Sequence, residues 1–255
     1  MLNVNRAWLI THENDTLQPD TQAKFEALLA RRLRGEPMAY ILGGREFYGL
    51  ALQVTPDTLI PRPDTEMLVG VALGRILSDH QVDVLDLGTG SGAIALAIAK
   101  HRPHAHVVAV DASSAALEVA KKNATTLQVS NVQFVLSSWF SALETQRFDV
   151  IVSNPPYIEQ NDAHLSQGDL RFEPVTALAS GTDGLDDIRR IIADSLVHLV
   201  PQGWLMLEHG YNQARRVADL MADAGLVEIE TVQDLGGNDR VTIGKNPLII
   251  SAHWS

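Results

Sequence analysis

DLGTGSGA, residues 86–93, begins in the last two residues of an apolar run over 82–87 and leads into a helical pattern. Its three glycines allow a tight turn and a close approach of the backbone to a ligand, and the first turn of the following helix leaves N–H groups free. Such a turn between a strand and a helix is typical of α/β folds that bind nucleotides. Gly88, Gly90 and Ala93 also satisfy the G-x-G-x-x-G/A pattern of dinucleotide-binding folds, so the stretch alone does not identify a cofactor.

From about residue 65 onward, short apolar runs alternate with helical patterns, which predicts a mostly parallel sheet covered by helices. We expect strands at 82–87, 107–110, 132–136, 148–152, 204–207, 227–232 and 241–243. We expect helices at 66–78, 92–101, 113–127, 185–199 and 212–224. Only a loop over 234–239 separates the last two strands, so we expect them to be antiparallel neighbours.

The residues before this alternation have a different character. The spacing of apolar residues predicts a helix over 19–35, which Gly35 and Pro37 end. The apolar positions of this helix are Phe25, Leu28, Leu29 and Leu33. Its polar face is basic through Lys24, Arg31, Arg32 and Arg34. This face is either a solvated helix surface or a contact surface for a partner.

A hairpin is predicted between this helix and the sheet. We expect a strand over 47–54, a turn at Pro56-Asp57 and a short return strand over 58–60. The sequence therefore predicts three parts, listed from the N-terminus. They are a helical region over 1–44, a β-hairpin linker over 45–64 and a sheet domain over 65–255.

The composition of the 255 residues is that of an ordinary globular protein, with 45% hydrophobic residues. The net charge of −11 disfavours a broad surface for binding duplex nucleic acid. The absence of cysteine excludes disulfides and thiolate chemistry. No apolar run approaches the ~20 residues that span a bilayer, so we expect no membrane contact and a cytoplasmic protein. The histidines show no spacing typical of metal ligands, so we expect no metal.

A second stretch, SNPPY at 153–157, follows the predicted strand over 148–152. Two consecutive prolines end a strand abruptly, because each lacks an N–H and has a fixed φ. The result is a rigid corner with free carbonyl groups, an amide side chain before it and an aromatic ring after it. Such a corner suits a planar group that carries N–H donors. In a doubly wound sheet it lies close to the glycine-rich loop, and this favours methyl transfer to a planar nitrogen over hydride transfer.

Other polar residues are expected at the same carboxyl edge of the sheet. Asp111 ends the second strand, where an acidic residue can bind ribose hydroxyls. Asp86 either orders the glycine-rich loop or faces an ammonium group of the ligand through water. Arg62 either lines the site or caps the linker, and we interpret Glu208 and His209 as structural.

The combination of these motifs resembles one family. DLGTGSG at 86–92 is similar to the cofactor loop of class I S-adenosylmethionine-dependent methyltransferases, and NPPY at 154–157 to the signature of amino-methyltransferases. Four further segments resemble the peptide chain release factor glutamine methyltransferases in particular. They are IPRPDTE at 60–66, Trp139-Phe140, RFEP at 171–174 and LEHG at 207–210. The resemblance covers about residues 20 to 244.

This resemblance implies a Rossmann-like class I methyltransferase fold: a mostly parallel seven-stranded sheet with an antiparallel last strand, preceded by a small helical region and a β-hairpin linker. It implies methylation of the glutamine amide nitrogen (N5) in the Gly-Gly-Gln motif of class I release factors. The implied cofactor is S-adenosylmethionine, with S-adenosylhomocysteine as product. The residues implied to bind it are Gly88, Thr89, Gly90, Ser91, Gly92, Asp111, Trp139 and Asn154.

The catalytic residues implied by the resemblance are Asn154, Pro155, Pro156 and Tyr157. We hypothesise that Asn154 Oδ1 and the Pro155 carbonyl accept both N–H bonds of the substrate amide, while Tyr157 packs on its plane. An amide nitrogen is a poor nucleophile, so alignment with the methyl group matters more than a strong base.

The sequence departs from the family in two places. Ser138 stands where the family often has an acidic residue, and the N-terminal region is shorter than usual. Three alternatives stay open. They are a glutamine methyltransferase acting on a ribosomal protein, an adenine-N6 methyltransferase acting on nucleic acid, and a cofactor-binding interaction module without catalysis. The net charge disfavours the nucleic-acid enzyme, and the intact corner at 154–157 disfavours the module.

Overall fold

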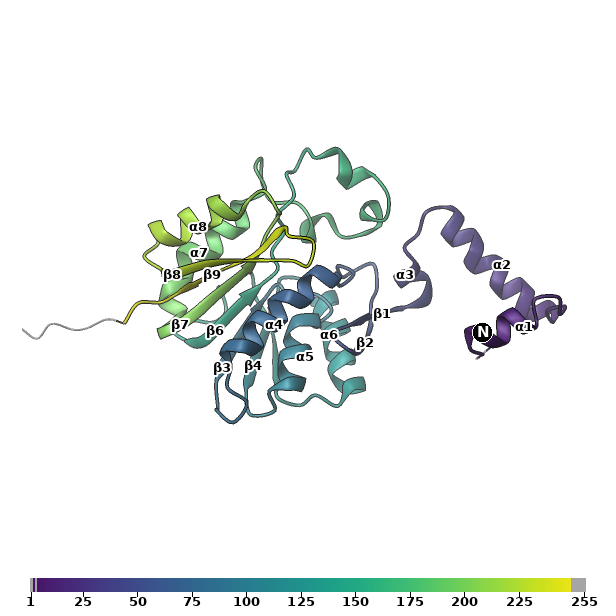
Figure 1. The fold of residues 1–255 in the computed structure, drawn as a ribbon, viewed down its shortest axis with the longest axis horizontal. Helices are drawn as coiled ribbons and strands as arrows, with labels where there is room; N and C mark the ends of the chain where they lie inside the picture. The colour runs from purple at the N-terminus through teal and green to yellow at the C-terminus, as the bar shows by residue number, and fades with distance from the viewer. Residues whose placement is uncertain (1, 3, 249–255) are drawn as a thin grey trace, which may run out of the picture.

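The computed structural model describes residue 2 and residues 4–248. Its centre is a seven-stranded sheet with the strand order β5-β4-β3-β6-β7-β9-β8 (Figure 1). The strands are β3 (Asp83–Leu87), β4 (His106–Asp111), β5 (Val132–Leu136), β6 (Phe148–Ser153), β7 (Leu199–Glu208), β8 (Val227–Gln233) and β9 (Asp239–Lys245). Strands β3 to β7 pair in parallel, and β9 is antiparallel to both of its neighbours, β7 and β8. The predicted seven strands and the antiparallel last strand are confirmed.

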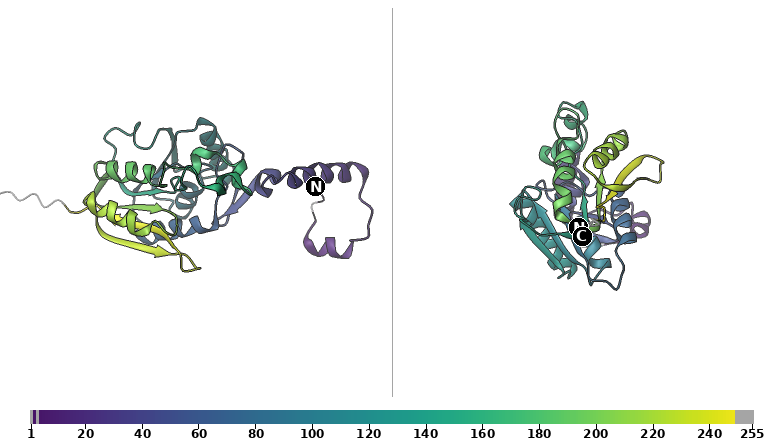
Figure 2. Two further views of the ribbon diagram at one scale, coloured as in Figure 1. Left: turned by 90° about the horizontal axis from the view of Figure 1, so that it is seen from above. Right: turned by 90° about the vertical axis from the view of Figure 1, so that its left-hand side faces the viewer.

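Helices cover both faces of this sheet (Figure 2). They are α4 (Glu66–Arg75), α5 (Ala93–His101), α6 (Ser114–Leu127), α7 (Asp186–His198) and α8 (Ala214–Asp223). Successive residues of a strand point to opposite faces, and the core divides accordingly. Val84 packs with the residues of α4 and α5, whereas Leu85 packs with those of α7 and α8. All five predicted helices of this part are present.

The order of the strands positions the site. The chain reverses its direction of travel across the sheet after β5, so β3 lies between β4 and β6. In open α/β sheets ligands bind at this kind of switch point, outside the carboxyl ends of the strands. The loops after β3, β4 and β6 therefore meet at one edge, as the positions of the glycine-rich loop and the 154–157 corner predict.

The hairpin is present, but its predicted register was wrong. Strands β1 (Gly44–Phe47) and β2 (Leu50–Gln53) are joined by a two-residue turn at Tyr48-Gly49. Both turn residues have positive φ, 49° and 77°, which matches the twist of paired strands and makes this tight turn possible. The predicted return strand over 58–60 is absent, because the backbone N–H of Ile60 donates to the buried Glu173 carboxylate instead of to a strand.

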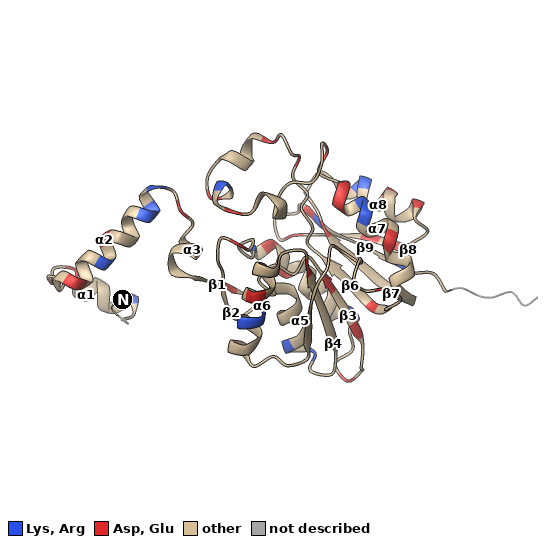
Figure 3. Ribbon diagram, turned by 180° about the vertical axis from the view of Figure 1, so that it is seen from behind, with Lys and Arg blue, Asp and Glu red and all other residues tan. Residues whose placement is uncertain are grey.

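The N-terminal region contains three helices, α1 (Arg6–Thr11), α2 (Pro19–Leu33) and α3 (Met38–Leu42), and its first two helices lie away from the sheet (Figures 1 and 2). Helix α2 has no buried residue. Arg31 and Arg32 lie in its last turn, where its ribbon is blue in Figure 3. Arg31 pairs with Glu36, and Arg32 pairs with Asp169 at 3.2 Å. Part of the basic face thus links the helix to the loop before α7.

No helix in residues 4–248 is both long and apolar enough to cross a bilayer.

Candidate active site

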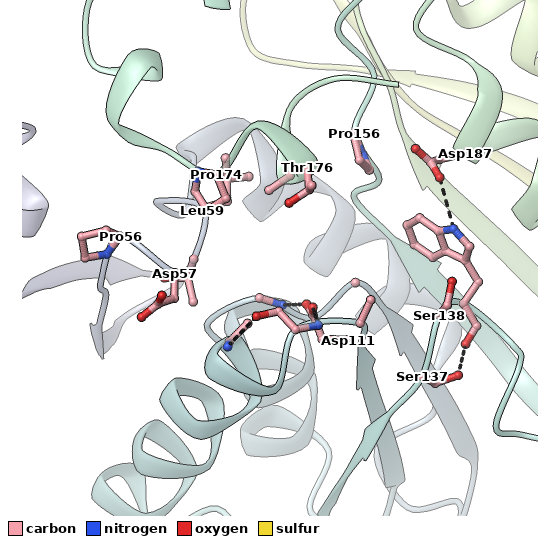
Figure 4. Close-up of a pocket in the computed structure, with 18 of the residues that line it drawn as sticks. Pro56, Asp57, Leu59, Asp111, Ser137, Ser138, Pro156, Pro174, Thr176 and Asp187 are labelled. Carbon is pink, nitrogen blue, oxygen red and sulfur yellow. Dashed lines mark hydrogen bonds between the residues drawn. The ribbon is translucent and has the colours of Figure 1, made fainter. Parts of the chain in front are cut away.

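Two neighbouring cavities lie at the carboxyl edge of the sheet. The larger has a volume of about 590 Å³, and Figure 4 shows Asp111 on one side of it, opposite Pro174 and Thr176. The smaller has a volume of about 80 Å³. Leu59 and Ala177 line both cavities, so the two are adjacent.

The glycine-rich loop forms part of the wall of the larger cavity. Gly88, Gly90 and Gly92 all have positive φ, at 72°, 56° and 84°, a region that glycine enters without strain. Gly88 and Gly90 line the cavity. A Cβ on Gly92 would approach the Leu96 and Ala120 side chains to 3.0 and 3.2 Å, so the loop packs closely against the core at this glycine. Thr89, Ser91 and Gly92 do not line the cavity. Thr89 and Ser91 are buried, and the Thr89 hydroxyl donates to Asp86.

Asp111 lies where the sequence predicts it, at the end of β4 and in the cavity wall. Its Oδ2 accepts the backbone N–H of Gly90 at 2.8 Å, and its Oδ1 accepts that of Ser113 at 2.8 Å. Each carboxylate oxygen can accept a further hydrogen bond. Asp111 therefore orders the glycine-rich loop and still presents an acceptor to a ligand hydroxyl.

Trp139 lines the same cavity and lies over Gly88, since a Cβ on Gly88 would meet its ring at 3.4 Å. Its backbone has a positive φ of 52°, and its indole Nε1–H donates to Asp187 Oδ1 at 3.2 Å (Figure 4). Asp187, in the first turn of α7, also accepts from Ser180 Oγ at 2.7 Å. The indole ring is thus held from both ends, with Ser138 beside it at the exposed side of the cavity.

Asp86 acts on the loop from inside the protein. It is fully buried, and its Oδ2 accepts from Thr89 Oγ1 at 2.6 Å and from the Ala95 N–H at 3.2 Å. Burial raises its pKa to about 7, although both hydrogen bonds oppose the rise. Of the two interpretations from the sequence, the loop-ordering one describes these contacts.

The corner at 154–157 separates the two cavities. Pro156 lines the larger cavity, while Asn154, Pro155 and Tyr157 line the smaller. Asn154 Nδ2 donates to Thr65 Oγ1 at 3.0 Å, and the Tyr157 hydroxyl donates to Glu208 Oε1 at 3.4 Å. The corner therefore faces the larger cavity on one side and, on the other, a small, mostly apolar cavity into which Arg62, Asn154 and Tyr157 bring polar groups.

Three residues with open interpretations have defined places. Arg62 lines the smaller cavity and also pairs with the buried Glu173 carboxylate, which accepts the backbone N–H of Ile60 in the linker. Glu208 is 1% exposed, and burial raises its pKa to about 7. His209 is buried and bonded to Thr242 Oγ1 at 2.8 Å, away from both cavities.

Sequence reasoning missed several residues of this edge. Asp187 and Arg190 from α7 and Pro56 to Leu59 from the linker line the larger cavity. Thr65 was quoted only as part of a motif, yet it contacts Asn154 directly. No local pattern marks these residues, because only the fold brings them to the edge. Within the described part of the chain, no group of three or more histidine or acidic side chains could hold a metal ion.

The lining of the larger cavity suits a nucleoside. A flat indole ring at one end suits an aromatic base, and the Asp111 carboxylate suits sugar hydroxyls. A ligand group beside Pro156 would lie next to the smaller cavity, which Asn154, Pro155 and Tyr157 of the same corner line. The arrangement can therefore hold a nucleoside cofactor and a second, planar polar group across one corner.

Two family models match the chain. The PrmC N-terminal domain matches residues 1–43, and the Methyltransferase small domain matches residues 66–171. A release factor glutamine methyltransferase of Xylella fastidiosa is 51% identical over 246 residues, covering 96% of this chain and 90% of that protein. A release factor glutamine methyltransferase of Vibrio cholerae is 52% identical over 242 residues, covering 94% of this chain and 84% of that protein.

A solved structure supports the fold. The 16S rRNA N2 G1207 methyltransferase of Thermus thermophilus, in complex with AdoMet and guanosine, aligns with a TM-score of 0.58 at 21% identity, over 80% of this chain and 49% of that chain. At this identity the likeness concerns the fold alone.

Proposed function

The chain belongs to the family of release factor glutamine methyltransferases, and from this premise we propose that it methylates the side-chain amide nitrogen (N5) of the glutamine in the Gly-Gly-Gln motif of class I peptide chain release factors. The observation that carries the proposal is the position of the corner at 154–157. It stands between a cavity that suits a nucleoside cofactor and a small cavity that suits a planar amide.

The larger cavity is proposed to hold S-adenosylmethionine. Trp139 would stack beside the adenine, Asp111 would accept from the ribose hydroxyls, and Gly88 and Gly90 would let the backbone approach the methionine part. When bound, S-adenosylmethionine supplies an activated methyl group on a positively charged sulfur, and S-adenosylhomocysteine remains. Thr89, Ser91 and Gly92 would act by shaping the loop, since they do not line the cavity.

The smaller cavity is proposed to hold the glutamine side chain. Asn154 Oδ1 and the Pro155 carbonyl would accept the two N–H bonds of the amide, and the Tyr157 ring would pack on its plane. These contacts would turn the lone pair of the amide nitrogen toward the larger cavity, which lies on the Pro156 side of the corner. Fixing two reactants in this way can lower a barrier by ~7–11 kcal/mol. The proton that leaves the methylated nitrogen needs no strong base, because the nitrogen has become very acidic.

The N-terminal region is proposed to contact the release factor. Phe25, Leu29 and Leu33 of α2 are 48%, 41% and 78% exposed, and such an apolar stripe suits a protein partner better than water. Because this partner works in translation, we propose a cytoplasmic location.

The test uses the full chain with S-adenosylmethionine carrying a labelled methyl group. It is incubated in parallel with a class I release factor, with the same factor in which the Gly-Gly-Gln glutamine is replaced by glutamate, with total ribosomal proteins and with DNA. We expect label on the unmodified release factor alone. Label confined to a ribosomal protein or to DNA would replace the proposed function by one of the two alternatives.

A further inference from the structure

The side-chain amide of Asn154 has one end engaged inside the protein. Its Nδ2 donates to Thr65 Oγ1 at 3.0 Å, and among the described residues nothing donates to its Oδ1. An asparagine amide can be turned by 180°, which exchanges a donor and an acceptor of almost the same shape. Whether the smaller cavity presents an acceptor or a donor therefore depends on what fixes the amide.

Thr65 alone cannot fix this direction, because a hydroxyl both donates and accepts. Thr65 is 4% exposed and lies at the end of the 3₁₀ turn Pro63–Thr65. Because it is buried, bulk water does not decide the direction in which its hydroxyl donates. A third group must take the hydroxyl proton for the oxygen to be left as an acceptor for Asn154 Nδ2.

Glu208 is suited to be this third group. It ends β7, the strand beside the one that leads into the corner, and it is 1% exposed. Its Oε2 is buried without a hydrogen-bond partner among the described residues, while its Oε1 accepts from Tyr157. An ionised carboxylate only accepts hydrogen bonds, so it draws the hydrogens of neighbouring hydroxyl groups toward itself.

The surroundings of Glu208 are consistent with this role. Burial raises its pKa to about 7, while hydrogen bonding from Thr65 and the positive charge of Arg240 act in the opposite direction and Asp64 adds to the rise. Arg240 is itself paired with Asp64 at 3.2 Å and with Asp234 at 2.9 Å. The carboxyl therefore lies beside two hydroxyl groups, those of Thr65 and Tyr157, that can both donate to it.

We propose that Thr65 and Glu208 are positioning residues that fix the direction of a hydrogen-bond chain, Asn154 to Thr65 to Glu208, and so keep Asn154 Oδ1 as the free acceptor in the smaller cavity. The inference rests on the proposed function for its meaning, because the group that needs an acceptor there is the N–H of a substrate amide. Neither residue touches the substrate; each acts through Asn154.

The variants for the test separate the hydroxyl from its surroundings. Thr65→Val keeps the shape and removes the hydroxyl, and Thr65→Ser restores the hydroxyl. Glu208→Gln keeps the shape and allows donation toward Thr65, which would turn the Asn154 amide. Thr242→Val is the matched control. It removes a hydroxyl that is equally buried but is bonded to His209 and Thr231.

The first readout needs no substrate. In the ¹⁵N–¹H spectrum of protein labelled at asparagine, the Asn154 NH₂ pair is the one lost in Asn154→Ala. We expect this pair to shift and to exchange faster with solvent in Thr65→Val and in Glu208→Gln, and to stay in place in Thr65→Ser and Thr242→Val. An Asn154 pair that is unchanged in Thr65→Val would overturn the proposal, whatever reaction the enzyme performs.

The second readout is the methylation of a release factor at pH 8. We expect kcat to fall by roughly tenfold to a hundredfold in Thr65→Val, to recover in Thr65→Ser, and to fall in Glu208→Gln. The dissociation constant of S-adenosylmethionine should stay within about twofold in all of them. A Thr65→Val enzyme with the kcat of Thr242→Val, or one that Thr65→Ser fails to match, would contradict the positioning role. Failure of the wild type to methylate any release factor would instead contradict the proposed function, and the spectrum would still report the orientation of Asn154.

Discussion

The backbone N–H of Gly90 donates to the Asp111 carboxylate over 2.8 Å. This bond joins the loop after β3 to the end of β4, across the point where two neighbouring parallel strands finish. Asp111 thus has two roles with one side chain, since it fixes the glycine-rich loop and presents acceptor capacity to the larger cavity.

Replacing Asp111 should therefore weaken cofactor binding more than the loss of one ligand contact would. In Asp111→Asn an amide N–H₂ replaces one acceptor and faces a backbone N–H. We expect the dissociation constant of S-adenosylmethionine to rise by at least about tenfold, which is about 1.4 kcal/mol. Isothermal titration calorimetry measures it. The control is Asp149→Asn, whose carboxylate accepts from the Asp83 N–H at the opposite edge of the sheet; equal effects of the two variants would contradict the role of Asp111.

Trp139 gives a direct optical probe of the same cavity. Its indole is held by Asp187 and lies over Gly88. We expect its fluorescence to change when S-adenosylmethionine binds, and the change to be lost in Trp139→Phe with affinity lowered by a few-fold. In Trp204→Phe, which removes an indole far from the cavities and packed against Arg75 and Lys245, the change should persist. A signal that disappears with Trp204 instead would place the ligand elsewhere.

Asn154 should separate catalysis from cofactor binding. Asn154→Ala removes the proposed acceptor for the substrate amide but leaves the lining of the larger cavity intact. We expect kcat for a release factor to fall by at least about a hundredfold, with the affinity for S-adenosylmethionine changed by less than about threefold. Rapid-quench methylation assays together with calorimetry measure both quantities. Near-normal turnover would mean that the amide is held by other groups.

The buried Glu208 predicts a dependence of stability on pH. Its pKa is raised by burial from an unfolded value near 4.5 to about 7. Between these values the folded protein holds a proton that the unfolded chain has lost, so the free energy of unfolding falls as pH rises through this window. Glutamine does not titrate. The free energy of unfolding of Glu208→Gln, measured relative to that of the wild type, should therefore increase by about 2–3 kcal/mol between pH 5 and pH 8.

Urea unfolding of both proteins at several pH values in this range measures the difference. The comparison isolates Glu208, because Asp86, whose pKa is also raised to about 7 by burial, is present in both proteins. Two stability curves that stay parallel from pH 5 to pH 8 would show that Glu208 has an ordinary pKa in the folded state.

The elements of the sheet domain could be predicted because each is a short apolar run or a helical pattern with clear ends. β5, for example, begins and ends at the predicted residues, Val132 and Leu136. The hairpin register could not be predicted, because it depends on a positive φ at Tyr48. Tyrosine seldom adopts this conformation, so the residue type does not indicate it. Helix α2 was predicted from its periodicity, but nothing local shows that its apolar stripe stays exposed.

The site was predictable where residues lie in the loops that follow strands. Gly88, Gly90, Asp111 and Pro156 meet in the larger cavity for this reason. Asp187 and Thr65 were missed, because they come from helical segments far away in the sequence and reach the edge only through the packing of those segments. Nothing local in the sequence indicates that Glu208 contacts Tyr157, because this contact depends on the alignment of β7 beside β6.

The most direct measurement of the central claim is the position of the methyl group. A class I release factor incubated with the full chain and S-adenosylmethionine is digested, and the peptide with the Gly-Gly-Gln motif is fragmented in a mass spectrometer. We predict that the mass of one methyl group appears on the glutamine residue alone, and that Asn154→Ala leaves this peptide unmodified. A methyl group on any other residue, or an Asn154→Ala enzyme that modifies the glutamine as fast as the wild type, would contradict the account.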